Sequence, residues 1–389
     1  MIISWHNFCL PGGMKNILKP YIMAACVGFL TIVSCSKIAS VTDVITKPSA
    51  RQIYKREFKD NKELFADWEN AFEKAKSDSI QISLPYGEKG TFNPQQNLVY
   101  SYVVELKEGE SLNATIYKDS VSHKVFIDLF ELRNGEYVHA SSAAPEENSI
   151  IHSPSDGGTF KVIVQPQVGS NSDFFFSFNK EPQYGFPVAG KGNNSIQSFW
   201  QDERDGGRRV HEGIDVFAKR GTPVVAVTDG TVSFTGERGL GGKQVWQRAG
   251  LFGNAIYYAH LDSISVSGGT RLRKGDTLGF VGNTGNARTT APHLHFGIYK
   301  AGGAVNPLPF VYEIPKISSK SYPRSFKKAA VTVKSKKGNL RIAPDTDGRK
   351  VGEVLAGEQV VLLGENNGWL HVLTSTGRKG FVHKSLVKA

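Results

Sequence analysis

The period of the hydrophobic positions changes along the chain, and each change predicts a different kind of structure. Within residues 52–76, Leu64, Trp68, Phe72 and Ala75 recur at helical spacing among lysine and glutamate residues. This repeat predicts an amphipathic helix whose apolar stripe packs against a core. The helix and a short polar tether before it make up residues 36–79.

Residues 80–180 contain short runs in which every second residue is apolar, separated by turn signals such as Glu108-Gly109 and Asn134-Gly135. The alternating positions are Tyr100, Tyr102, Val104, Leu106, Val125, Ile127, Leu129, Phe160, Val162, Val164, Phe174, Phe176 and Phe178. Such runs predict an antiparallel β-sandwich. The pattern resembles the sandwich modules found beside secreted bacterial peptidases, but it contains no diagnostic motif and does not indicate what the module does.

Residues 183–310 are also predicted to be all-β, because short strand-like runs fill them and no long helical pattern interrupts them. Residues 224–227 and 231–234 flank Asp229-Gly230, which predicts a β-hairpin.

The last part of the chain is predicted to be a linker and a small β-barrel. Prolines, serines and five basic residues mark residues 311–328 as the linker. Strand alternation and glycine turns in residues 329–389 predict the barrel. The expected fold class is therefore mainly β, with an N-terminal helix and a β-sandwich, a second β domain and a small barrel.

Residues 1–35 have the features of an export signal. A basic region around Lys15 precedes an apolar stretch, residues 21–33, which is shorter than the roughly 20 residues of a membrane-spanning helix. The stretch ends in Ile32-Val33-Ser34-Cys35, which resembles the lipobox of bacterial lipoproteins and implies lipidation of Cys35. An ordinary signal peptide or a short membrane anchor is the alternative. All three interpretations export the protein, and either lipidation or a short membrane anchor would attach it to a membrane.

The formal charge of +11 is unevenly distributed over the 389 residues. Residues 311–328 and 329–389 carry +4 and +5, and a basic end attracts anionic polymers or surfaces. For an exported protein this favours cell-wall material or anionic lipid as a partner over nucleic acid. The three cysteines, Cys9, Cys26 and Cys35, all lie near the N-terminus, so neither a disulfide framework nor a thiolate zinc site is expected in the globular part.

Four of the ten histidines lie in the stretch from His211 to His295. They occur in the segments His211-x-x-x-Asp215, Tyr258-Ala-His260-Leu261 and Pro292-His293-Leu294-His295-Phe296. On a strand, side chains at i and i+2 share a face, so the last two histidines point the same way while the residues between and after them point into the core. Histidine is the commonest metal ligand, and aspartate supplies a hard oxygen.

This set of residues can hold a catalytic zinc ion. Such an ion usually keeps three protein ligands and one open position, and His211, Asp215 and one member of the His293/His295 pair supply three ligands. The ion would acidify a water molecule and polarise a carbonyl group. His260 and the other member of the pair are then available for proton transfer and for stabilising an oxyanion.

Together these motifs resemble those of the LytM/lysostaphin-type zinc metalloendopeptidases. The resemblance covers roughly residues 183–310. It includes the run Lys274-Gly-Asp-x-Leu-Gly-x-Val-Gly-Asn-Thr-Gly285. It implies a compact β-sheet groove in which one Zn²⁺ ion is bound, and an enzyme that cuts peptide cross-links or stem peptides of peptidoglycan.

The resemblance also implies a role for each polar residue. By position, His211, Asp215 and His295 would bind the zinc ion, while His260 and His293 would form the catalytic pair. Because all five positions are kept, an active enzyme is expected.

The sequence departs from the family pattern at two places. Thr290-Ala291-Pro292 stands where the family usually has glycine before Pro-His, and residues 237–254 form an unusual groove loop. Some family members lack the ligands and only activate other hydrolases. A wall-binding regulator with a restrained groove is therefore the main alternative, and an exported metalloprotease acting on ordinary peptides is another.

The C-terminal segment carries a second resemblance. Asn339-Leu340-Arg341-x-x-Pro344, Gly368-Trp369 and Gly380-Phe381-Val382 resemble a bacterial SH3-like domain. Such domains often bring secreted hydrolases to the cell wall, and a spacer module is the alternative. The expected partners are peptidoglycan, anionic envelope polymers through the basic linker and this domain, and a membrane through the lipid anchor, with no nucleic acid. The expected location is the cell envelope.

Overall fold

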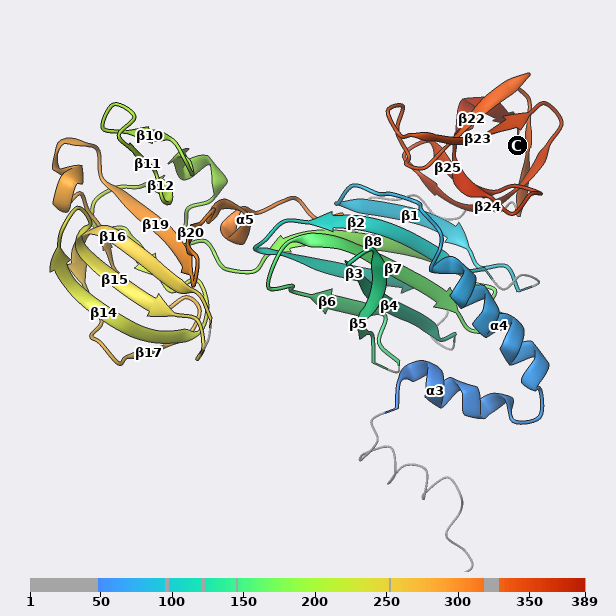
Figure 1. Cartoon of the computed structure of the whole chain (residues 1–389), viewed down its shortest axis with the longest axis horizontal. Helices are drawn as coiled ribbons and strands as arrows, with labels where there is room; N and C mark the ends of the chain where they lie inside the picture. The colour runs from blue at the N-terminus through green and yellow to red at the C-terminus, as the bar shows by residue number, and fades with distance from the viewer. Residues whose placement is uncertain are drawn as a thin grey trace, which may run out of the picture.

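The computed structural model confirms the mainly β fold class (Figure 1). The residues it describes are 48–94, 98–119, 123–144, 146–251, 253–317 and 329–388. The signal segment with Cys35 and most of the basic linker lie outside the described residues. Within the described part of the chain, no helix is long and apolar enough to cross a membrane.

The predicted N-terminal helix is broken into pieces. They are α3 (Ala50–Lys55), the 3-10 helix η1 (Arg56–Phe58) and α4 (Lys62–Ala75). Asn61 caps α4 by accepting a hydrogen bond from the backbone N–H of Leu64 at 3.3 Å, which explains why the second helix starts there. The buried face of α4 contains Phe65, Trp68, Phe72 and Ala75, so Phe65 takes the core position expected for Leu64.

The predicted sandwich forms from two packed sheets. Its strands are β1 (Tyr86–Thr91), β2 (Tyr100–Leu106), β3 (Glu110–Lys118), β4 (Val125–Arg133), β5 (Glu136–Ser142), β6 (Ser149–His152), β7 (Gly158–Pro166) and β8 (Asp173–Pro182). One sheet has the order β2-β7-β4-β5, and the other contains β1-β8-β3-β6. The alternating aromatic residues of β2 and β8 fill the core between them, as the period of two requires.

A separate antiparallel sheet forms the body of residues 183–311. Its strands are β9 (Ile196–Ser198), β12 (Ile214–Phe217), β13 (Pro223–Val225), β14 (Gly230–Arg238), β15 (Gly242–Arg248), β16 (Ala255–Ile264), β17 (Arg271–Leu272), β18 (Thr277–Val281), β19 (His293–Lys300) and β20 (Gly303–Val305). The main order is β17-β14-β15-β16-β19-β12-β9. A separate hairpin pairs β10 (Glu203–Arg204) with β11 (Arg209–Val210). The helical segments are η2 (Asn193–Ser195), η3 (Gly285–Thr289) and α5 (Leu308–Val311).

The hairpin predicted around Asp229-Gly230 is wrong. Strand β13 pairs with β18, whereas β14 pairs with β15 and β17. The chain does bend at residues 227–229, and Asp229 accepts a hydrogen bond from the backbone N–H of Lys274 at 2.8 Å. A local turn, however, does not determine which strands pair across it, and here the two flanking strands pair with other partners.

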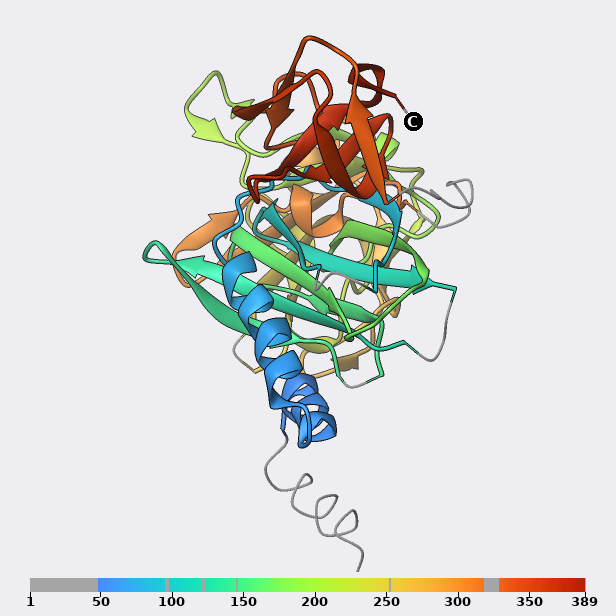
Figure 2. The same ribbon diagram turned by 90° about the vertical axis from the view of Figure 1, so that its right-hand side faces the viewer.

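The C-terminal barrel continues one sheet of the sandwich. Its elements are β21 (Ala330–Val333), β22 (Lys337–Arg341), β23 (Lys350–Leu355), β24 (Gln359–Asn366), β25 (Trp369–Leu373), β26 (Lys379–His383), η5 (Lys384–Leu386) and β27 (Val387–Lys388). Figures 1 and 2 show the barrel beside the sandwich. Strand β24 pairs with β1, with Lys89 opposite Glu365. Leu363 and Phe381 of the barrel belong to the core of the sandwich. The barrel and the sandwich therefore form one packed unit.

A buried polar cluster lies at this junction. Glu88 of β1 is fully buried and accepts hydrogen bonds from the hydroxyls of Tyr86 at 2.5 Å and Tyr102 at 2.8 Å. Nδ1 of His371 in β25 lies 3.1 Å from the same carboxylate. His371 is thus a buried structural residue that joins the two modules.

Candidate metal centre and groove

Three neighbouring strands bring the candidate residues together. Strand β19 lies between β12 and β16 and places His295 opposite Asp215 on one side and opposite Ala259 on the other. Leu294 and Phe296, the alternate residues of β19, point into the core as predicted. His211 lies just before β12, four residues before Asp215. The pairing register of β19 thus determines the contacts of the site.

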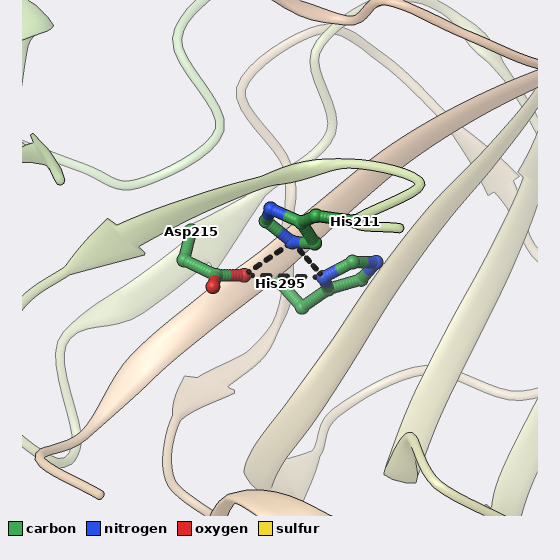
Figure 3. A group of neighbouring side chains, drawn as sticks. All are labelled: His211, Asp215 and His295. Atoms are coloured by element: carbon green, nitrogen blue, oxygen red, sulfur yellow. Dashed lines mark hydrogen bonds and ion pairs between the residues drawn. The ribbon is translucent and has the colours of Figure 1, made fainter. Parts of the chain in front are cut away.

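Three ligand atoms converge at one point (Figure 3). Nε2 of His211 lies 3.0 Å from Oδ1 of Asp215 and 3.0 Å from Nδ1 of His295, which in turn lies 3.1 Å from the same oxygen. Ligands about 2.0–2.2 Å from a tetrahedral zinc ion lie roughly 3.3 Å apart, so two nitrogens and one oxygen in this arrangement fit such an ion.

The position of His211 is set by its second nitrogen. Nδ1 of His211 lies 2.8 Å from the carbonyl oxygen of Phe199, which can only accept a hydrogen bond. Nδ1 therefore carries the proton, and Nε2 presents a lone pair to the site. A β-carbon at Gly213, within the same motif, would come within 2.7 Å of the His295 ring. Glycine is therefore required there for the close approach of the two ligand segments.

His260 and His293 lie beside the three ligands without joining them. Their ring centroids are 5.1 Å apart, and that of His260 is 5.8 Å from that of His295. Nδ1 of His260 donates to the carbonyl oxygen of Thr284 at 2.9 Å, and Nδ1 of His293 donates to that of Ala291 at 2.8 Å. In both rings Nε2 is left available, and both side chains line the groove.

The backbone at His260 has an uncommon conformation, with a φ angle of 63°. Non-glycine residues adopt this left-handed region rarely, and such residues cluster at functional sites. The backbone N–H of His260 donates to the carbonyl oxygen of Gly241 at 2.8 Å, which helps to hold the strained residue in place.

Burial and neighbouring groups shift the ionisation of the site. Burial alone would raise the pKa of Asp215, but its close contacts with the rings of His211 and His295 hold it well below its usual value. Burial lowers the pKa of His260 to about 4, assisted by the neighbouring charges of His295 and His293. Burial also lowers the pKa of His295, although Asp215 opposes the shift. The carboxylate and the neutral imidazoles are the forms that bind a metal cation.

An open groove of about 970 Å³ contains the ligand and histidine side chains. The segment 237–254, expected to be an unusual groove loop, contains the end of β14, all of β15 and the turns on either side of β15. Of its described residues, Leu240 and Gly241 line the groove. The segment Thr290-Ala291-Pro292, which departs from the family pattern, contributes Thr290 to the groove wall. The hydroxyl of Thr290 donates to the carbonyl oxygen of Ala287.

Sequence reasoning missed the residues that support the ligands. Arg204 donates to Oδ2 of Asp215 at 3.1 Å and also to the hydroxyl of Ser198. This leaves Oδ1 of Asp215 directed at the two histidines. Phe217 stacks on His293 with ring centroids 4.9 Å apart. The strand period could have indicated Phe217, because it shares a face with Asp215, whereas no local pattern marks Arg204.

Comparison with known proteins gives two family matches. Residues 209–307 match Peptidase family M23, and residues 336–388 match the bacterial SH3 domain. The DD-carboxypeptidase/endopeptidase Mpg of Neisseria meningitidis is 37% identical over 135 residues, which are 35% of this chain and 29% of that protein. The L-Ala--D-Glu endopeptidase of Bacillus subtilis is 35% identical over 129 residues, 31% of this chain and 39% of that protein.

A solved structure is similar to about the same share of this chain. The catalytic domain of lysostaphin from Staphylococcus simulans shares 30% sequence identity over 30% of this chain and 92% of that chain, with a TM-score of 0.28. The chain spans less than two fifths of the length of the Neisseria and Bacillus relatives. The chain thus carries an M23 peptidase domain with an intact HxxxD…H ligand set, followed by a bacterial SH3 domain.

Proposed function

We propose that this protein is an exported zinc metalloendopeptidase that hydrolyses peptide bonds in the cross-links or stem peptides of peptidoglycan. The observation that carries the proposal is the convergence of His211, Asp215 and His295 inside an open groove, beside two histidines whose Nε2 atoms are available. Similarity to a DD-carboxypeptidase/endopeptidase and to an L-Ala--D-Glu endopeptidase supports this substrate class.

His211, Asp215 and His295 would hold the zinc ion. When bound, zinc supplies a Lewis acid that polarises a carbonyl group and acidifies a water molecule. Arg204 keeps the second oxygen of Asp215 engaged, so the carboxylate offers one oxygen to the metal. The carbonyl oxygen of Phe199 fixes the tautomer of His211 in the same way.

His260 and His293 would handle protons and the developing negative charge. Each ring is anchored by Nδ1 to a backbone carbonyl oxygen, so Nε2 can accept a proton at the groove and, once protonated, donate a hydrogen bond. Donors that are already oriented stabilise an oxyanion strongly because no reorganisation is needed during the reaction. The stacking of Phe217 on His293 restricts that ring further.

The remaining parts of the proposal concern location. Lipidation of Cys35 would attach the protein to a membrane, and the basic segment 311–328 and the SH3 domain would attract anionic envelope polymers. The family matches support an exported protein that meets the cell wall. Because the barrel packs on the sandwich, the two would approach the wall together.

The test is incubation of the zinc-loaded protein with intact sacculi, followed by mass spectrometry of the released fragments. The controls are a chelator, the variant His295→Ala and an unrelated protein such as casein. Metal-dependent loss of cross-linked fragments, with casein intact, is the expected result and identifies the bond. One equivalent of bound zinc without new fragments would favour the regulator, and digestion of casein would favour a general protease.

A further inference from the structure

One wall of the groove is a hairpin with three arginines. Strands β10 and β11 are joined by residues 205–208, in which Asp205, Gly206 and Gly207 have φ angles of 54°, 68° and 84°, all in the left-handed region that glycine readily adopts. Arg204, Arg208 and Arg209 of this hairpin all line the groove. A short, sharp turn therefore places three guanidinium groups along one side of the candidate active site.

Two of these arginines already have carboxylate partners. Arg204 pairs with Asp215 at 3.1 Å, and Arg209 pairs with Asp205 at 2.6 Å. Arg208 differs, because its Nε donates to the backbone carbonyl oxygen of Asp205 at 3.0 Å. Among the described residues, its two terminal nitrogens form neither an ion pair nor a hydrogen bond. Arg208 is thus held in one orientation, and no carboxylate among the described residues forms an ion pair with it.

The described groove lining gives Arg208 no ion-pair partner, and the nearby Asp205 carboxylate, which interacts with its charge, is itself paired with Arg209. Besides Asp215, the lining contains one carboxylate, Glu212, whose side chain lies 3.5 Å from the hydroxyl of Tyr299. A guanidinium group whose terminal nitrogens are free presents two parallel N–H donors, which match the two oxygens of a carboxylate.

We propose that Arg208 forms a carboxylate-binding subsite that selects acidic peptides as substrates. The inference rests on the proposed function, because it specifies the substrate class of the same groove. Peptidoglycan stem peptides that keep a free carboxylate are the chemical class this subsite fits, and amidated stem peptides are not. The subsite acts on binding, and it does not need to touch the bond that is cut.

The experiment measures binding of two synthetic peptides to the zinc-loaded full-length protein by calorimetry. The probes are L-Ala-γ-D-Glu-L-Lys-D-Ala-D-Ala and its twin with every carboxylate amidated. The wild type is expected to bind the acidic peptide about tenfold more tightly, which is the typical contribution of a charge-assisted hydrogen bond. Arg208→Gln is expected to reduce the ratio of the two affinities to about one. Arg208→Lys, which keeps the charge but loses the paired donors, is expected to give an intermediate ratio.

The matched control is Arg271→Gln, an exposed arginine of β17 that does not line the groove. It is expected to keep the wild-type ratio. Equal affinities in the wild type, an unchanged ratio in Arg208→Gln, or no binding of either peptide would each overturn the subsite. Cleavage of sacculi by the same preparations tests the proposed function separately, because it depends on His295 and not on the affinity ratio. If the protein cleaves sacculi but binds the acidic and the amidated peptide equally well, the subsite is disproved and the proposed function is not.

Discussion

Two regions of this molecule bring histidine and carboxylate together, and they differ in what surrounds the pair. In the groove, His211 and His295 meet Asp215 beside a space of about 970 Å³. At the junction of sandwich and barrel, His371 meets Glu88 with both side chains fully buried. The same side-chain chemistry is thus placed once at an open site and once in a sealed core.

The difference lies in how the carboxylate oxygens are satisfied. Glu88 receives two tyrosine hydroxyls in addition to His371, so neighbouring protein groups occupy it. Asp215 has one oxygen held by Arg204 and the other directed at two imidazole nitrogens. A buried carboxylate surrounded by donors stabilises the packing, whereas one that faces two lone pairs can bind a cation. The following predictions separate these two roles.

The largest expected effect is that of His295→Ala. Removal of one of three ligands should abolish stoichiometric zinc binding and reduce cleavage of sacculi at least about 1000-fold, since the metal supplies most of the activation. Zinc content and released fragments are the measurements. His139→Ala, an exposed histidine of the sandwich, is the control and should behave like the wild type. Full zinc content in His295→Ala would contradict the assignment.

Glu88→Ala should destabilise the fold by about 3–5 kcal/mol, because it removes the carboxylate that Tyr86, Tyr102 and His371 share in a buried polar cluster. Glu88→Gln should cost less, since it keeps an oxygen that can accept. The free energy of unfolding, measured by urea denaturation, gives the effect, and zinc content should stay at one equivalent. Equal stability of Glu88→Ala and the wild type would mean that the cluster does not hold the junction.

Removal of zinc by a chelator should destabilise the groove and leave the junction unchanged. At zinc concentrations 100 to 1,000 times the dissociation constant, the bound metal contributes about 3–4 kcal/mol to the domain that holds it. Hydrogen exchange should therefore increase in β12 and β19 and remain constant in β24. An increase in β24 as well would show that the metal site and the barrel are coupled.

The smallest expected effect is that of Arg204→Gln, which should weaken zinc binding about 10- to 100-fold without changing the ligand set. Groups that orient metal ligands typically contribute this much to metal affinity. Competition with a chromogenic chelator measures the affinity, and Arg271→Gln is the control. If the two variants bind zinc equally well, the contact between Arg204 and Asp215 does not position the ligand.

Several features could be predicted from local pattern because they depend on neighbouring residues. The period of two placed Leu294 and Phe296 in the core, and the helical repeat placed Trp68 and Phe72 on the buried face of α4. The break before α4 was missed because a capping residue, Asn61, competes with the apolar repeat. The hairpin around Asp229-Gly230 was wrong because strand pairing depends on residues far away in the sequence.

The sequence by itself determined the chemistry that is available: the HxxxD and HxH motifs, the glycines between them and the alternation that makes the chain mainly β. The tertiary structure decided which atoms meet. It placed Asp215 opposite His295, directed Arg204 at the second carboxylate oxygen and joined Glu88 to His371 across 283 positions of sequence. The physical reason is that periodicity reports which face of an element is apolar, whereas contacts between distant segments follow from strand register and packing, which no local pattern contains.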